Sequence, residues 1–165
     1  MIDLPLAEGL ADLEHVLPAF LVRTGVAALC GGMIGIEREL QHKPAGFRTN
    51  ILICAGAAMY MVVGPLIVAN GATMTDPSRI AAQVVTGIGF LGAGCIIQAG
   101  GRVTGLTSAA TIWVVAAIGI IAGAGFPILA AIASAMVVMT LAVLRQVERR
   151  WIDPRRSRGT GDIED

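Results

Sequence analysis

The sequence predicts an all-α protein, built as a polytopic transmembrane bundle of about five helices. The chain of 165 residues is 55% hydrophobic and only 15% charged, and it holds 21 glycines. Its mean hydropathy is +0.75. Soluble domains carry about 25% charged residues and about 7% glycine, so both departures indicate a membrane protein. Five apolar segments, each of roughly the 20 residues that cross the hydrocarbon, supply the helices of the bundle.

Composition divides the chain into three parts. Residues 1–16 are acidic and carry no basic residue, which argues against a cleaved signal peptide and predicts a short helix at the membrane interface. Residues 17–145 form the membrane domain, with spans expected at 17–36, 47–69, 76–98, 106–122 and 126–144. Residues 146–165 form a basic tail that we expect to be flexible.

The distribution of basic residues predicts the orientation of the bundle. Six of the 12 basic residues lie between Arg145 and Arg158, and Trp151 among them is a candidate interfacial anchor. With five spans, the tail lies on the same side as the loops that carry Lys43 and Arg102. The positive-inside rule therefore predicts a cytoplasmic C-terminus and an outer N-terminus.

The first span carries a packing face and an arginine. Gly31 and Gly35 are spaced as a small-xxx-small pair, which lets a neighbouring helix approach closely. Arg23 lies near the start of the span. Two alternatives stay open for it: the side chain extends to the headgroups, or it meets a buried partner.

Local signals also predict where the other spans begin and end. Pro65 is expected to kink or end the second span, and Thr107 or Ser108 to cap the fourth. A glycine-rich turn at Gly100 and Gly101 joins the third span to the fourth, and a tight turn covers 123–127.

The third span is the one around which the sequence is organised. Asp76 can accept hydrogen bonds from free N–H groups at its start, and Pro77 stands where no donor is needed. On a helical wheel, one face is polar or small: Arg79, Ala82, Gln83, Thr86, Phe90, Ala93 and Gly94. The other face is apolar: Ile80, Val84, Ile88, Leu91 and Cys95. We predict a membrane helix with a buried functional stripe made of Asp76, Arg79, Gln83 and Thr86.

Glycines within this span imitate a nucleotide-binding turn. Gly87, Gly89 and Gly92 match the spacing G-x-G-x-x-G, but that fingerprint needs a preceding strand and an acidic residue about twenty positions later. Neither is present. Together with Gly94, these glycines are instead predicted to pack against other helices, and a homo-oligomer follows as an expectation, with a dimer favoured.

Several classes of function are disfavoured by the composition. Twelve basic and twelve acidic residues cancel, which gives no electrostatic case for nucleic acid. Three cysteines lie in apolar stretches without C-x-x-C spacing, so they are expected to be small core residues, although Cys95 stays a candidate. The two histidines lie in separate loops, and no catalytic triad, metal set or phosphate loop is visible. We therefore expect no enzymatic activity and no cofactor.

Four sequence blocks resemble the MgtC/SapB family. They are GGMIGIERE at 31–39, GFRTN at 46–50, DPSRIAAQVVTGIGFLGAG at 76–94 and VTGLTSAATIW at 103–113. The resemblance covers about Leu21 to Gly125. It implies a multi-pass protein of the bacterial inner membrane, linked to growth in low magnesium and, in pathogens, to survival inside macrophages. Some members of the family restrain the F-type ATP synthase, and others are labelled magnesium transporters. Long members carry a further cytoplasmic domain, whereas this sequence ends at Asp165.

Two functions remain, and regulation is favoured over transport. A regulatory protein would bind other membrane proteins through its polar and small faces. A cation pathway would use the oxygen ligands that Mg²⁺ prefers, and the candidates are Glu37 and Asn50 on the cytoplasmic side, Asp76 outside, and Gln83 and Thr86 between. The wider cytoplasmic-side cluster of candidate residues comprises Glu37, Arg38, Arg48, Thr49, Asn50 and Thr107. Against transport, no carboxylate lies at mid-membrane and Arg79 would repel a cation. A structural alternative is that Asp76 caps its helix and pairs with Arg79 or Arg23.

Overall fold

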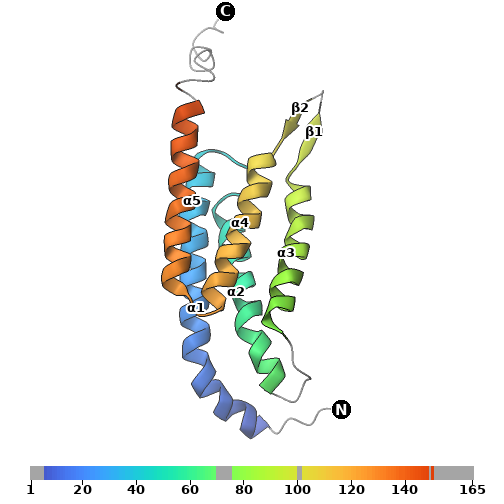
Figure 1. The fold of residues 1–165 in the computed structure, drawn as a ribbon, viewed down its shortest axis with the longest axis vertical. Helices are drawn as coiled ribbons and strands as arrows, with labels where there is room; N and C mark the ends of the chain where they lie inside the picture. Colours follow the sequence, from blue (N-terminus) through green and yellow to red (C-terminus); the bar gives the residue numbers. More distant parts are fainter. Residues whose placement is uncertain (1–5, 70–75, 100–101, 149, 151–165) are drawn as a thin grey trace, which may run out of the picture.

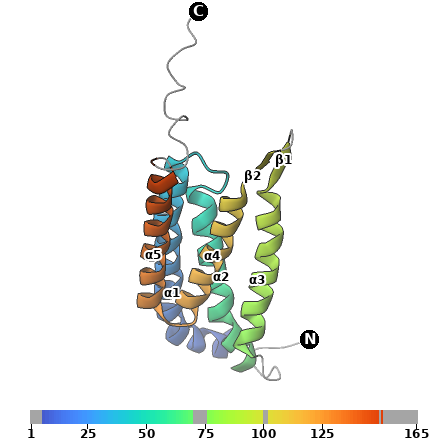
Figure 2. The same ribbon diagram turned by 45° about the horizontal axis from the view of Figure 1, so that its top comes forward.

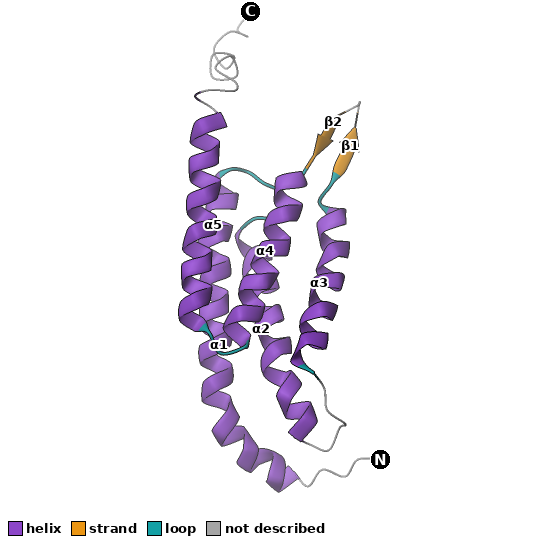
Figure 3. Cartoon of the chain, in the orientation of Figure 1, coloured by secondary structure: helices purple, strands orange, loops and turns teal. Residues whose placement is uncertain are grey.

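The computed structural model describes residues 6–69, 76–99, 102–148 and 150. Five helices run in alternating directions along one long axis, and a short β-hairpin joins two of them (Figures 1 and 3). The helices are α1 (Leu6–Leu40), α2 (Phe47–Ala69), α3 (Pro77–Gly94), α4 (Leu106–Gly123) and α5 (Pro127–Val147). The hairpin consists of β1 (Ile97–Ala99) and β2 (Arg102–Thr104). The predicted helical bundle is therefore confirmed.

Four of these helices are long and apolar enough to cross a membrane. The candidate spans are Val16–Leu40, Phe47–Gly64, Leu106–Gly123 and Pro127–Val147. Helix α3 has 18 residues but is not among them. It nevertheless lies lengthwise beside α2 and α4 (Figures 1 and 2), two of the helices that contain candidate spans.

Helices α1, α2 and α4 form the centre of the bundle, while α5 and α3 lie on opposite sides of it (Figure 2). The core contains Ile34, Cys54, Ile112, Val115 and Ile118, all at most 1% exposed. Large apolar side chains on the outer face of α5 are exposed, as a lipid-facing helix requires.

Close packing at the centre depends on glycines of two helices. A Cβ built on Gly31 would lie 2.5 Å from the carbonyl oxygen of Asn50, and one on Gly35 would lie 2.8 Å from the Cα of Phe47. The predicted packing role of both glycines is confirmed. Gly119 and Gly123 of α4 make equally close approaches to α2, which the sequence analysis did not predict.

The N-terminal region differs from the prediction. Residues from Leu6 onward are continuous with the first span in a single helix of 35 residues, rather than forming a separate short helix. Pro18 lies inside it, and the segment before Pro18 curves away from the rest of α1 in Figure 1. Proline removes one backbone hydrogen bond and bends the helix without ending it.

Two predictions about helix ends are wrong, whereas the predicted bounds of the second span are confirmed. Helix α3 ends at Gly94 rather than at Gln98, because the chain turns into the hairpin, in which Gln98 is opposite Val103. Helix α2 has the bounds predicted for the second span, Phe47–Ala69, so Pro65 lies within the helix and does not end it. Helix α4 starts at Leu106, and its N-cap residue is Gly105, with a positive φ of 88° and no side-chain cap, so neither Thr107 nor Ser108 caps it. The expected turn at 100–101, the loop 70–75 and most of the tail, with Trp151, lie outside the described residues.

Candidate functional site

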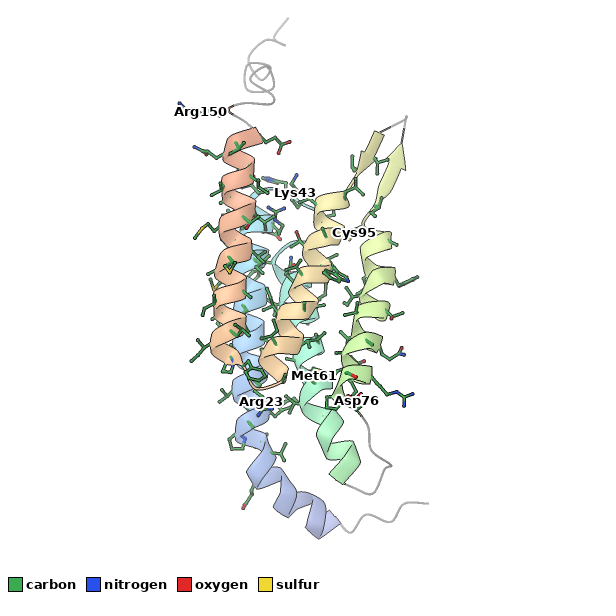
Figure 4. The ribbon with its side chains drawn as sticks, viewed as in Figure 1. Arg23, Lys43, Met61, Asp76, Cys95 and Arg150 are labelled. Atoms are coloured by element: carbon green, nitrogen blue, oxygen red, sulfur yellow. The ribbon has the colours of Figure 1, made fainter. Side chains whose placement is uncertain are left out.

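The two ends of the bundle carry different polar residues, and we call them the hairpin end and the Asp76 end. The hairpin end carries Lys43 and the β-hairpin, and the Asp76 end carries Asp76 and Arg23 (Figure 4). The expected cytoplasmic side corresponds to the hairpin end.

A buried polar cluster lies at the hairpin end, where α1 finishes and α2 and α4 begin. We define it as Glu37, Arg38, Asn50, Ser108 and Thr111. Arg38, Asn50 and Ser108 are each at most 3% exposed. Arg38 forms an ion pair with its neighbour Glu37. Burying a charge without such a partner costs several kcal/mol by order of magnitude, so the pair neutralises what would otherwise be an uncompensated charge.

Asn50 connects this cluster to the start of α2. Its Nδ2 donates to the carbonyl oxygens of Ala45 at 2.9 Å and Gly46 at 2.8 Å. Its Oδ1 is buried without a hydrogen-bond partner, and so is Oε1 of Glu37. Buried acceptors are normally satisfied by protein or by ordered water. The cluster therefore offers two oxygens that could accept a hydrogen bond.

Three residues predicted for the cytoplasmic-side cluster do not join it. Arg48, Thr49 and Thr107 are exposed at the hairpin end. The carbonyl oxygen of Thr107 accepts a hydrogen bond from the Thr111 hydroxyl at 2.7 Å. Helical spacing placed these residues at the correct end but could not decide which side of each helix is covered.

Glu39 is a residue that the sequence analysis missed. Its Oε2 accepts a hydrogen bond from the backbone N–H of Phe47 at 2.9 Å, so it satisfies a free donor at the start of α2. Gly46 lacks the side chain that would occupy the position of this carboxylate. Glu39 also lines an exposed groove of about 730 Å³ with Lys43, Arg48 and Thr49. An acidic residue just before a turn and a helix start was the available signal.

The buried polar cluster does not fit a dehydrated Mg²⁺ ion. Magnesium takes about six oxygen ligands in octahedral geometry. The cluster offers one carboxylate oxygen and one amide oxygen, and Arg38 neutralises that carboxylate. Within the described part of the chain, no group of three or more His, Cys, Asp and Glu side chains could hold a metal.

Arg23 has a specific partner at the Asp76 end. Its NH1 donates to the carbonyl oxygen of Gly123 at 3.1 Å, at the last turn of α4. Gly125, with a φ of 98°, turns the chain directly beside the guanidinium. A cation is favourable near a helix C-terminus, where carbonyl groups lack partners. Of the two alternatives for Arg23, the partner is thus the observed one.

The polar stripe of α3 is not buried by the rest of the chain, which corrects the prediction. Arg79, Gln83 and Thr86 are exposed, while Val84 and Ile88 pack against the core of the bundle. Arg79 and Gln83 line the open groove between α3 and α2. The apolar face of an amphipathic helix binds its own bundle, so the polar face is left outside. The predicted wheel is correct, and only the assignment of the inner face is wrong.

Asp76 caps α3 as predicted. Its Oδ1 accepts from the N–H of Ser78 at 2.9 Å, and its Oδ2 accepts from the Ser78 hydroxyl at 2.7 Å. These hydrogen bonds hold the pKa of the Asp76 carboxyl below its ordinary value. No ion pair joins it to Arg23 or Arg79 among the residues that the structure describes.

The glycines of α3 do not pack as predicted within this chain. A Cβ on Gly87, Gly89 or Gly94 would meet nothing within 4 Å, whereas Gly92 is buried against Ala109 of α4. A groove of about 950 Å³ separates α3 from α2 and is mostly apolar. Cys95, at the end of α3, is a half-buried free thiol.

These features define a class: a helical membrane protein with a buried polar cluster at one end and an exposed polar face on one outer helix. A model of the MgtC family matches residues 25–150 of the chain. The chain therefore belongs to the MgtC family.

Curated relatives agree with this assignment. Over 138 residues the chain is 44% identical to "Putative magnesium transporter YhiD" of Escherichia coli K12, covering 81% of this chain and 64% of the relative. It is 46% identical over 119 residues to "Protein MgtC" of Brucella abortus, covering 72% of this chain and 48% of the relative. An uncharacterized protein of Synechocystis is 42% identical over 125 residues, covering 76% of this chain and 52% of the relative. The chain thus spans about half to two-thirds of these relatives, and no solved structure matches it.

Proposed function

We propose that this chain is a non-enzymatic protein of the bacterial inner membrane that regulates other membrane proteins during adaptation to low magnesium or to a host. The relative named MgtC and the relative named a magnesium transporter support the link to magnesium. The observation that favours regulation over transport is the apolar core that separates the buried polar cluster at the hairpin end from the polar groups of the Asp76 end.

A cation crossing the bundle would need oxygen ligands along its whole length. Two buried side-chain oxygens of the described residues lie outside the buried polar cluster. The Ser134 hydroxyl donates to the carbonyl oxygen of Cys30 at 3.0 Å, and Oγ1 of Thr24, on α1, has no hydrogen-bond partner. The core between the two ends is apolar, with Ile34, Ile112 and Ile118. One chain therefore offers no polar route from end to end.

The surface that fits a regulated partner is the exposed groove at the hairpin end. Lys43 and Arg48 are exposed in it beside Glu39 and Thr49. A surface with charges of both signs selects a partner protein through electrostatic complementarity, which gives specificity more than affinity. In the expected orientation the groove faces the cytoplasm, where soluble parts of membrane complexes are accessible. The F-type ATP synthase is a candidate partner, as the family resemblance implies.

The test is photo-crosslinking in native membranes from position 48. A benzoylphenylalanine replacing Arg48 should capture a protein other than this chain, identified by mass spectrometry. The same probe replacing Met136, which is 63% exposed on α5, reports the lipid-facing background. Capture of lipid or of this chain only, from position 48, would reject the proposed docking surface. ATP hydrolysis by inverted vesicles, with and without the chain, decides whether the synthase is the partner.

Cation transport is the second candidate, and one observation favours it. Oε1 of Glu37 and Oδ1 of Asn50 are buried acceptors without partners, which a hydrated cation could contact. Purified protein in liposomes should then take up Mg²⁺ faster than empty liposomes, and Asn50→Leu should abolish the difference. Uptake equal to that of empty liposomes would exclude this candidate.

A further inference from the structure

The outer face of α3 forms a continuous seam that the chain leaves uncovered. Six residues of this face are separated alternately by three and four positions, which is the a and d pattern of a coiled coil. All six are exposed, and Phe90 is exposed by 82%. We define the α3 seam as Asp76, Arg79, Gln83, Thr86, Phe90 and Ala93.

This seam lies at membrane depth. Helix α3 is about 27 Å long at 1.5 Å per residue, close to the hydrocarbon thickness of about 30 Å. Gln83 is six residues from its start, or about 9 Å along the axis. The Thr86 hydroxyl donates to the carbonyl oxygen of Ala82 at 2.9 Å. The Gln83 amide has no partner in the described part of the chain, and an unpaired amide in hydrocarbon is costly.

We propose that the α3 seam binds the α3 seam of a second copy of this chain, as a parallel, in-register helix pair in a two-fold symmetric dimer. Two copies inserted in one membrane share one orientation. Their two-fold axis must then run along the membrane normal, so the same residues face each other at each level. The inference is independent of the proposed regulatory function.

Along the whole seam, the side chains of one copy are chemically complementary to the side chains of the second copy that face them. A glutamine amide both donates and accepts, so Gln83 and the second copy's Gln83 satisfy each other, and a single polar a position also sets register. Arg79 lies three residues, or about 4.5 Å along the axis, from the level of the second copy's Asp76, which carries the opposite charge. Phe90 pairs with its own copy as an aromatic contact. Lipid would cover Phe90 but would leave Gln83 unpaired.

The residues beside the seam leave room for a second helix. Gly87 and Gly94 occupy e positions and Gly89 a g position, and a Cβ on any of them meets nothing within 4 Å. The groove between α3 and α2 opens next to Arg79 and Gln83. A partner helix can therefore approach α3 without displacing any part of the chain.

Cysteine crosslinking in native membranes tests this pair. Thr86→Cys, at a d position, should form a disulfide-linked dimer under mild oxidation, severalfold above Met136→Cys on the lipid-facing side of α5. The unmodified chain, whose cysteines are buried or half-buried, gives the background. A yield equal to that of Met136→Cys, or a crosslink to a protein of another mass, would overturn the proposal.

A second variant separates loss of the dimer from loss of the fold. Gly89→Leu should reduce the mass of the purified full chain in nanodiscs from that of two copies to that of one copy. The monomeric variant should still show a cooperative unfolding transition at a temperature close to that of the unmodified chain. A dimer that persists in Gly89→Leu contradicts the proposed seam. Labelling of Thr86→Cys by a lipid-soluble thiol reagent as fast as Met136→Cys would mean that lipid covers the face. Neither result bears on partner capture from position 48 at the hairpin end.

Discussion

Helices α1 and α3 both carry glycines at helical spacing, but the surroundings of these glycines differ. Gly31 and Gly35 of α1 lie directly against the backbone of α2, whereas a Cβ on Gly87 or Gly89 of α3 would meet nothing within 4 Å. The same residue type thus closes an interface inside the chain in one helix and leaves a surface open in the other. Small residues permit close approach, and the tertiary arrangement decides whether a neighbour is there.

The largest expected effect comes from filling the α1–α2 interface. Gly31→Leu places a Cβ 2.5 Å from the carbonyl oxygen of Asn50, which forces the two helices apart. We expect a loss of about 3 kcal/mol or more, the upper end of overpacking costs. Thermal unfolding in detergent measures it.

Gly25→Leu is the matched control on the same helix, since nothing lies within 4 Å of its Cβ position. It should unfold close to the unmodified protein. Equal destabilisation of both variants would mean that helix propensity, rather than the interface, causes the loss.

A smaller loss is expected at the junction between the hairpin and α4. Gly105 has a φ of 88° and lies against the carbonyl oxygen of Cys95. Gly105→Ala is therefore strained both in its backbone conformation and by the contact of its Cβ with that oxygen. A left-handed conformation costs a non-glycine residue about 1–2 kcal/mol, and the contact adds to that. Urea or thermal unfolding should show the loss. Gly56→Ala on α2, which has open space and no positive φ, should be neutral or stabilising; a loss there of the same size contradicts the argument.

Removing the arginine contact at the end of α4 should cost about 1–2 kcal/mol. Arg23→Gln weakens both the hydrogen bond to Gly123 and the favourable charge at the helix C-terminus. The unfolding temperature reports the loss. Arg48→Gln, at an exposed arginine of the hairpin end, serves as control and should leave that temperature unchanged.

The smallest effect is the pH dependence of the start of α3. The pKa of the Asp76 carboxyl is lowered from its ordinary value of 3.8, chiefly by hydrogen bonds from Ser78. Because the pKa is lower in the folded state than in the unfolded state, the contribution of Asp76 to stability is complete at pH values above the ordinary pKa. This contribution is lost as the pH falls through the pKa of the folded state. Hydrogen exchange in the first turn of α3 should accelerate in that acidic range relative to Asp76→Asn. Identical pH profiles of the two proteins would contradict the assignment.

The sequence placed most of the polar residues at the end of the bundle where they lie, but it did not predict their burial or their hydrogen-bond partners. Asp76 was recognised as a cap because capping depends on residues within one turn. Asn50 was predicted for the cytoplasmic-side cluster, but its two hydrogen bonds to the carbonyl oxygens of Ala45 and Gly46 depend on the path of the loop. Glu39 was missed because its partner, the N–H of Phe47, is eight residues away across a turn.

The sequence alone determined the five helices, most of their ends and the polar and apolar faces of α3, because these depend on side-chain periodicity and on local capping. Only the tertiary structure decided that Arg23 meets Gly123 and that the polar face of α3 lies outside. Both depend on contacts between residues far apart in the chain: 100 positions separate the first pair. Periodicity places residues around a helix axis, but it carries no information about the side on which the neighbouring helices lie.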